Sequence, residues 1–155
     1  MDVEVKELPE MRLAYMRRLG AYGPEVGEVW DRFRRWALPR GLLRPDAVTL
    51  GVCHDNPEVT APEHCRYDVG LVVDEDFRPD EHVNVQTVPG GSYAIYPFEG
   101  RAEEVGKAWH DLFAQWLPDS GYQPDDRPCF ERCFETETAD AEIFRMQICI
   151  PVRPL

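Results

Sequence analysis

The chain has 155 residues, a net charge of −12 and 14 prolines spread along its length. This size suits one compact domain, or two very small ones that share a core. Nucleic-acid binding needs a surplus of Lys and Arg to neutralise phosphates, so no direct nucleic-acid partner is expected. Residues 1–8 are too acidic for a signal peptide, and no apolar run approaches the ~20 residues of a membrane span. We expect a cytoplasmic protein without a membrane partner.

Hydrophobic periodicity predicts eight short strands and two helices in chain order. The first helix is expected to begin near Glu25 and end before Pro39, and the second to begin near Glu104 and end before Pro118. Pro-Gly-Gly at 89–91 predicts a hairpin turn, and residues 8–11 occupy the matching place. The predicted strands cover residues 3–8, 12–19, 48–53, 66–73, 83–88, 92–98, 129–134 and 143–152.

The two halves of the chain resemble each other. VKELP at 5–9 matches VQTVP at 85–89, an offset of 85 − 5 = 80, and EVGEVW at 25–30 matches EVGKAW at 104–109. The sequence therefore predicts an α+β fold of duplicated strand–strand–helix–strand–strand units, about 1–80 and 81–155, with antiparallel sheets. Pseudo-twofold symmetry would place a central cleft at their junction, although side chains could equally fill that junction.

Glu131 is the candidate polar anchor of such a cleft. Strand alternation places its side chain on the same face as Cys129 and Cys133, which are usually buried residue types. Gly51 is the equivalent residue of the first half. A buried carboxylate needs a partner, and a cationic ligand would supply one. The alternative is an edge position in which an arginine forms a salt bridge with Glu131.

Aromatic residues are the second candidate element of the site. Flat aromatic walls beside a carboxylate suit organic cations, through stacking and cation–π attraction. For any one of these residues, packing in the core is an alternative, and the equivalent helix positions of Trp30 and Trp109 indicate a structural role. The candidates near the junction are Tyr15, Tyr22, Tyr67, Tyr93, Tyr96, Phe98, Trp109 and Phe144.

Other chemistry has weaker support in the sequence. The five cysteines include no CxxC pair, which favours reduced thiols over a metal site. His54 and His64 flank a turn-rich loop and are expected to be solvated. Nucleotide-binding and common hydrolase motifs do not occur. We expect no metal and no cofactor.

Several strings, in order along nearly the whole chain, resemble the GyrI-like family, which includes DNA gyrase inhibitors and the effector-binding domains of AraC- and MerR-type multidrug regulators. These strings are GAYGP at 20–24, GVCHDNP at 51–57, CRYD at 65–68, GGSYA at 90–94, Trp109, and PCFE at 128–131. The resemblance implies the duplicated α+β fold and a ligand cleft. It also implies Glu131 as the pocket carboxylate, with Trp109, Tyr67 and other aromatic residues in the wall. We predict Tyr22, Tyr93 and Phe144 as further ligand-binding residues. Family members often carry Tyr where this chain has Cys133.

The resemblance implies a standalone binding protein for amphipathic, cationic drug-like molecules, without its own DNA-binding domain. Two alternatives remain open. Some relatives resemble hydrolases of electrophilic cyclopropane-bearing natural products, in which case Glu131 and Trp109 would direct water. The other alternative is a protein partner, either DNA gyrase or a transcription regulator.

Overall fold

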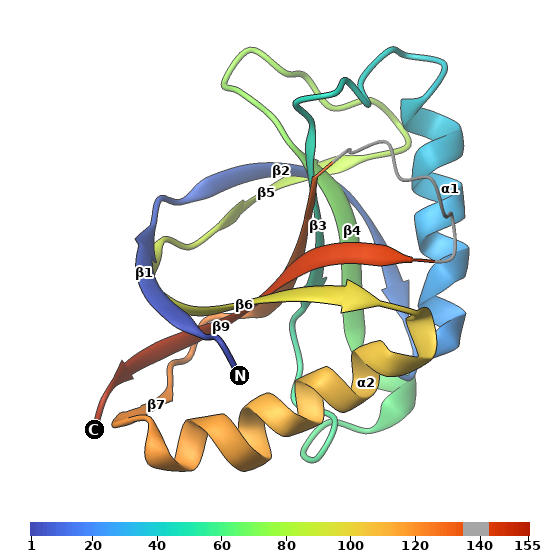
Figure 1. The fold of residues 1–155 in the computed structure, drawn as a ribbon. Helices are drawn as coiled ribbons and strands as arrows, with labels where there is room; N and C mark the ends of the chain where they lie inside the picture. The colour runs from blue at the N-terminus through green and yellow to red at the C-terminus, as the bar shows by residue number, and fades with distance from the viewer. Residues whose placement is uncertain (135–142) are drawn as a thin grey trace.

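The computed structural model describes residues 1–134 and 143–155, which form an α+β fold of one strongly curled antiparallel sheet and two helices (Figure 1). Within the described residues, no helix is both long and apolar enough to cross a membrane. The strands are β1 (Glu4–Leu8), β2 (Met11–Leu19), β3 (Val48–Cys53), β4 (Arg66–Val72), β5 (Asn84–Val88), β6 (Gly91–Gly100), β7 (Tyr122–Pro124), β8 (Cys129–Phe134) and β9 (Phe144–Pro154), and the helices are α1 (Gly27–Ala37) and α2 (Ala102–Asp111).

The eight predicted strands are confirmed to within about two residues at each end. The structure contains one further strand, β7, which has three residues and was not predicted from the sequence. Helix α1 ends at Ala37, shortly before Pro39, as the missing proline N–H predicts. Helix α2 ends earlier, at Asp111, and a π-helical turn (Leu112–Trp116) and a 3₁₀ turn (Leu117–Asp119) continue its path.

The strands follow the order β1-β6-β9-β8-β3-β4-β2-β5, with β7 added on β9. The predicted hairpin turns at 8–11 and 89–91 are wrong, because β1 pairs with β6 and β2 pairs with β5. The curl of the sheet brings its two end strands, β1 and β5, close together. Residues 9–10 therefore link β1 to β2, which pairs with β5, and residues 89–90 link β5 to β6, which pairs with β1. The links pack closely: a Cβ on Gly90 would lie 2.7 Å from the Glu10 nitrogen and 2.8 Å from the Leu8 oxygen.

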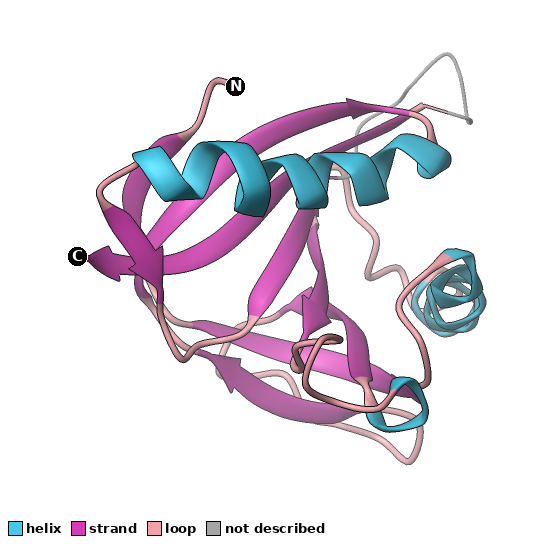
Figure 2. Ribbon diagram, turned by 90° about the horizontal axis from the view of Figure 1, so that it is seen from below, coloured by secondary structure: helices cyan, strands magenta, loops and turns pink. Residues whose placement is uncertain are grey.

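Side chains alternate between the two faces of the sheet and form three apolar clusters. The inner face of the curl holds one cluster, which includes Leu13, Leu50, Tyr93 and Phe130. The outer face carries the other two clusters, one against each helix. Figure 2 shows the two helices outside the curled sheet. The strands β3 and β8 pair between the two helix-covered regions, so outward side chains at this junction lie between α1 and α2.

Candidate functional site

Glu131 lies in the interior of the sheet, on the outer face between the two helix-covered clusters. Strand β8 pairs with β3 on one side and with β9 on the other, so that Glu131 lies opposite both Gly51 and Ile148. Glu131 is half-buried as a residue, and it forms no ion pair with any residue that the structure describes. The alternative for Glu131, a position on an edge strand with a salt bridge to an arginine, is therefore wrong.

A chain of hydrogen bonds joins Glu131 to both helices. The Tyr67 hydroxyl donates to Glu131 Oε1 at 3.0 Å, and the Trp30 indole nitrogen of α1 donates to the Tyr67 oxygen at 3.0 Å. From the other side, the Trp109 indole nitrogen of α2 approaches Glu131 Oε2 at 3.5 Å, the longest and weakest of these contacts. The carboxylate is thus held by two neutral donors.

Gly51 makes this arrangement possible. The Tyr67 side chain extends from β4 across β3 and lies over Gly51 on its way to Glu131. A Cβ at position 51 would overlap the Tyr67 hydroxyl and would lie 3.2 Å from Cζ2 of Trp30. The residue opposite Glu131 must therefore lack a side chain.

Burial raises the pKa of Glu131, and the hydrogen bonds from Tyr67 and Trp109 oppose this shift in part. Burial also raises the pKa of Tyr67 far above its ordinary value, and the charge of Glu131 adds to this effect. Tyr67 is therefore a proton donor throughout the physiological range. Cys53 and Cys129 face each other beside this pair, and burial raises the pKa of Cys129 to about 12. Neutral thiols are poor nucleophiles and poor metal ligands.

Aromatic rings extend the site on both sides of Glu131. The ring of Tyr22 meets that of Tyr67 edge-on, with centroids 6.1 Å apart, and Phe113 stacks on Trp109 with centroids 6.5 Å apart. Tyr22 is fixed in place because its hydroxyl donates to the Arg66 carbonyl at 2.7 Å. These rings present flat apolar faces next to a carboxylate.

The structure brings together four of the six predicted site residues: Glu131, Trp109, Tyr67 and Tyr22. Tyr93 lies instead on the inner face, fully buried, because strand alternation turns it toward Phe130, whose ring centroid is 5.1 Å away. Phe144 begins β9 opposite Gly100 and is 45% exposed, without a ring contact to the cluster.

Trp30 is not among the predicted site residues, yet its indole completes the hydrogen-bond chain. Its equivalence to Trp109 was interpreted as a sign of structural packing. The same sequence match could have identified Trp30, because Trp109, to which it corresponds, is a predicted wall residue.

The prediction for His54 is wrong. Its side chain is 16% exposed, and its Nε2 lies 2.7 Å from Oδ2 of Asp68, which is fully buried on the inner face. Arg17 and Gln86 also bind this carboxylate, and although burial raises the pKa of Asp68, these hydrogen bonds lower it to about 2. Within 1–134 and 143–155, no group of three or more His, Cys, Asp or Glu side chains is arranged to hold a metal ion.

Two surface hollows lie away from Glu131. One, of about 660 Å³, lies beside α1 and β2, and the other, of about 280 Å³, lies next to Trp116. Neither is lined by Glu131. At the junction of the halves, the side chains of Tyr67 and Trp109 occupy the space beside the carboxylate, which corresponds to the filled junction that the sequence left as an alternative.

Comparison with known proteins identifies the class. The family model of the GyrI-like small molecule binding domain matches residues 1–153. The SPbeta prophage-derived protein YosT of Bacillus subtilis (strain 168) is 38% identical over 116 residues, which cover 74% of this chain and 77% of YosT. A DNA gyrase inhibitor of Edwardsiella piscicida is 31% identical, with 99% of both chains covered. This chain belongs to the GyrI-like family of small-molecule-binding domains.

Solved structures share the fold at low sequence identity. The C-terminal domain of EcmrR superposes with a TM-score of 0.75 at 15% identity, covering 99% of this chain and 98% of that domain. SAV2435, solved with bound tetraphenylphosphonium, superposes with a TM-score of 0.72 at 16% identity, covering 99% of this chain and 94% of SAV2435. The curled half-barrel with two helices is therefore the fold of this family.

Proposed function

We propose that this protein binds amphipathic organic cations between α1 and α2, with Glu131 as the ionic anchor. One observation carries the proposal: the carboxylate of Glu131, a half-buried residue whose pKa is raised by burial, lies between indole and phenol rings, without an ion pair to any described residue. A monovalent cation with apolar substituents compensates such a charge and covers the surrounding rings.

Binding requires a rearrangement of the side chains that fill the junction. Trp109 is the easier one to displace, because its 3.5 Å contact to Glu131 is weak and its ring lies on Phe113, on the exposed side. Tyr67 is held more firmly, since its oxygen takes part in two hydrogen bonds of 3.0 Å. A ligand would thus enter from the α2 side, displace the Trp109 indole from Oε2 and stack on it, while Tyr67 keeps Oε1 in place.

Tetraphenylphosphonium is a suitable probe, because the structural neighbour SAV2435 was solved with this cation. Tryptophan fluorescence titration is expected to give saturable binding that weakens at least tenfold in Glu131→Gln, as loss of a desolvated charge partner implies. The matched control, Glu103→Gln, changes an exposed carboxylate of α2 and should leave the affinity unchanged. Equal binding by neutral triphenylphosphine oxide, or by Glu131→Gln, would contradict the proposal.

We also infer that the fold is an internal duplication with pseudo-twofold symmetry. The pairing register supports this. Gly51 pairs with Glu131, and 51 + 80 = 131, so Gly51 pairs with the residue that corresponds to it in the second half of the sequence. At the other end, Leu8 pairs with Gly91, and the equivalent pair, 88 and 11, also occurs. On this view the axis passes between Gly51 and Glu131, where the two halves differ most in chemistry. Circularly permuted chains that start at residue 81 would be expected to fold.

A hydrolase is a second candidate, because Glu131 has a raised pKa and a protonated tyrosine bound to it, the combination that acid–base chemistry uses. Incubation with an electrophilic cyclopropane compound would then give its water-addition product, and Glu131→Gln would abolish turnover while retaining a bound neutral substrate. No product above the buffer rate would exclude this activity for that compound.

The third candidate is inhibition of DNA gyrase, favoured by the 31% identity to a DNA gyrase inhibitor over nearly the whole of both chains. A supercoiling assay with purified gyrase tests it directly. Inhibition at micromolar protein is the expected result, and undiminished supercoiling at that concentration would contradict it.

A further inference from the structure

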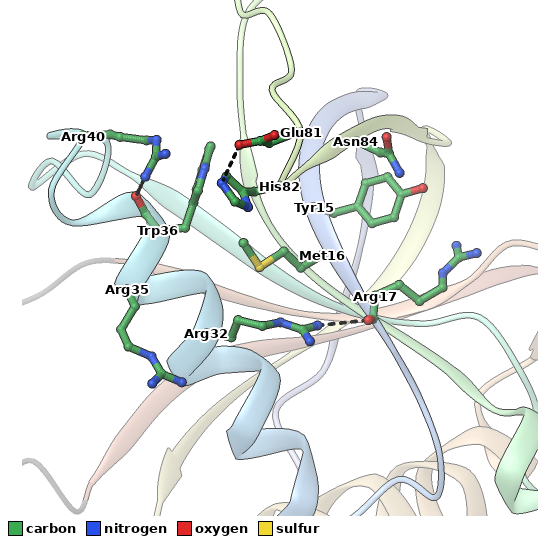
Figure 3. A pocket seen from close by; sticks show the side chains of 10 residues that line it. All are labelled: Tyr15, Met16, Arg17, Arg32, Arg35, Trp36, Arg40, Glu81, His82 and Asn84. Carbon is green, nitrogen blue, oxygen red and sulfur yellow. Dashed lines mark hydrogen bonds and ion pairs between the residues drawn. The ribbon is translucent and has the colours of Figure 1, made fainter.

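The hollow beside α1 is the opposite of the Glu131 site in charge. Its volume is about 660 Å³, and Figure 3 shows its lining contributed by α1, by β2 and by the segment that leads into β5. The lining contains four arginines in a chain with a net charge of −12 and 17 Lys and Arg in total. Its ten residues are Tyr15, Met16, Arg17, Arg32, Arg35, Trp36, Arg40, Glu81, His82 and Asn84.

Arg17 borders the hollow through its backbone, while its side chain turns to the inner face of the sheet and binds the buried carboxylate of Asp68 (Figure 3). Its Nε and Nη2 donate to the two oxygens of Asp68 at 2.8 and 3.0 Å, in the bidentate geometry that orients a guanidinium most strongly. His54 and Gln86 hold the same carboxylate from its other sides. The Arg17 side chain nevertheless stays 38% exposed. The charge of Arg17 is paired with Asp68, and its guanidinium points away from Arg32.

Arg32 and Arg35 carry the uncompensated positive charge of the hollow. Arg32 Nη2 donates to the Arg17 carbonyl at 3.1 Å, which extends its side chain from α1 to β2 (Figure 3), and Arg35 Nε donates to the Asp31 carbonyl at 3.3 Å. Among the residues that the structure describes, neither guanidinium forms an ion pair with a carboxylate. Carbonyl bonds orient these groups but leave their charges available to an anion.

The base of the hollow is apolar and partly aromatic. Met16 and Trp36 are 8% and 6% exposed, and the guanidinium of Arg40 lies over the Trp36 indole at 4.9 Å from the ring centre. Asp80 fixes this indole by accepting from its Nε1 at 2.9 Å. Arg40 itself is only loosely paired with Asp80, at 3.6 Å. A bound molecule would thus meet a ring edge and a thioether below guanidinium groups.

We propose that this hollow is a second ligand site, which takes an amphipathic organic anion of the aromatic carboxylate class. Its anionic group would be bound by Arg32 and Arg35, and its ring would lie against Met16 and Trp36. The site is independent of the cation site, since no lining residue takes part in the Glu131 hydrogen-bond chain.

The probe is 1-naphthoate, titrated into the full chain by isothermal calorimetry at low ionic strength. We expect saturable binding that the double variant Arg32→Gln/Arg35→Gln weakens at least tenfold, because two charge-assisted contacts are lost. Arg78→Gln is the matched control, since Arg78 is an exposed arginine whose side chain donates to the Glu75 and Phe77 carbonyls away from this lining. Added salt should weaken binding in the wild type more than in the double variant.

Two controls separate this site from the proposed cation site. The neutral alcohol 1-naphthalenemethanol should bind at least tenfold more weakly than 1-naphthoate, and the double variant should keep its affinity for tetraphenylphosphonium. Inorganic phosphate that competes with 1-naphthoate would support recognition through the charge. Equal 1-naphthoate affinity in the wild type and the double variant, or equal binding of the alcohol, would overturn the proposal.

Discussion

Gly51 and Glu131 lie directly opposite each other where β3 pairs with β8, and the absence of a side chain at position 51 lets Tyr67 reach the carboxylate. A carboxylate and an empty position on neighbouring strands thus form one functional unit. The hydrogen bonds of Trp30, Tyr67 and Trp109 converge there from both helices.

Gly51→Ala is expected to expel Tyr67 from this position, since the new Cβ would overlap its hydroxyl. Overpacking of this kind costs about 1–3 kcal/mol in unfolding free energy, and tetraphenylphosphonium affinity should fall in parallel. Denaturant unfolding and fluorescence titration measure the two effects. The control is Gly106→Ala in α2, where a Cβ meets nothing within 4 Å and helix propensity favours alanine. Retention of both properties in Gly51→Ala would contradict this role of Gly51.

Tyr67→Phe removes the donor to Glu131 and the acceptor of the Trp30 indole. The expected loss in unfolding free energy is about 1–2 kcal/mol, because one buried indole nitrogen is left without its partner. The pKa of Glu131 should rise further, since the Tyr67 bond lowers it in the wild type. A carboxyl-carbon NMR titration measures the shift. Tyr96→Phe serves as control, as the Tyr96 hydroxyl has no hydrogen bond among the described residues; an unchanged Glu131 titration in Tyr67→Phe would be inconsistent with the geometry.

Glu131→Gln is expected to stabilise the free protein at neutral pH, by about 0.5–2 kcal/mol, the usual gain when a strained functional group is replaced. The sign follows from the raised pKa of Glu131 in the folded state: its stability contribution is fully present below the unfolded pKa and is lost as pH rises through the folded pKa. At pH 8 the variant should therefore have a higher thermal unfolding midpoint than the wild type. This difference in midpoint should disappear near pH 4. A variant less stable than the wild type at pH 8 would count against a carboxylate that awaits a cation.

Asp68→Asn tests the buried network on the inner face. The pKa of Asp68 is lowered to about 2, so its contribution is present above its ordinary pKa of 3.8 and is lost as pH falls through about 2. We expect a loss of about 2–4 kcal/mol at pH 7, since Arg17 and His54 lose their charged partner. The difference in unfolding free energy between the variant and the wild type, measured by denaturant unfolding, should become smaller below pH 4. Asp46→Asn, at an exposed position, should have the same unfolding free energy as the wild type. If Asp68→Asn lost as much unfolding free energy at pH 2 as at pH 7, the lowered pKa of Asp68 would be contradicted.

Much of the fold could be predicted from the sequence, because alternation and proline positions are local signals. The pairing of β1 with β6 and of β5 with β2 could not, since the pairing partner of a strand depends on the curl of the whole sheet. In the site, the pattern around Glu131 and its match to Gly51 indicated the junction. The contact of His54 with buried Asp68 could not be predicted, because the sequence of a turn-rich loop does not indicate whether it covers an inward-facing carboxylate.

The basic hollow was equally invisible in the sequence. Arg32 and Arg35 occupy helix positions that normally face solvent, and Arg17 follows a strand pattern. Only the three-dimensional arrangement places them around one space with Met16 and Trp36.

The pH dependence of tetraphenylphosphonium affinity tests the central claim most directly. The cation binds the ionised form of Glu131, so the affinity of the wild type should rise as pH increases through the raised pKa of this residue and then level off. Between pH 5 and pH 9, Glu131→Gln should bind weakly and independently of pH. An affinity that is flat with pH in the wild type, or the same rise in Glu131→Gln, would contradict Glu131 as the ionic anchor.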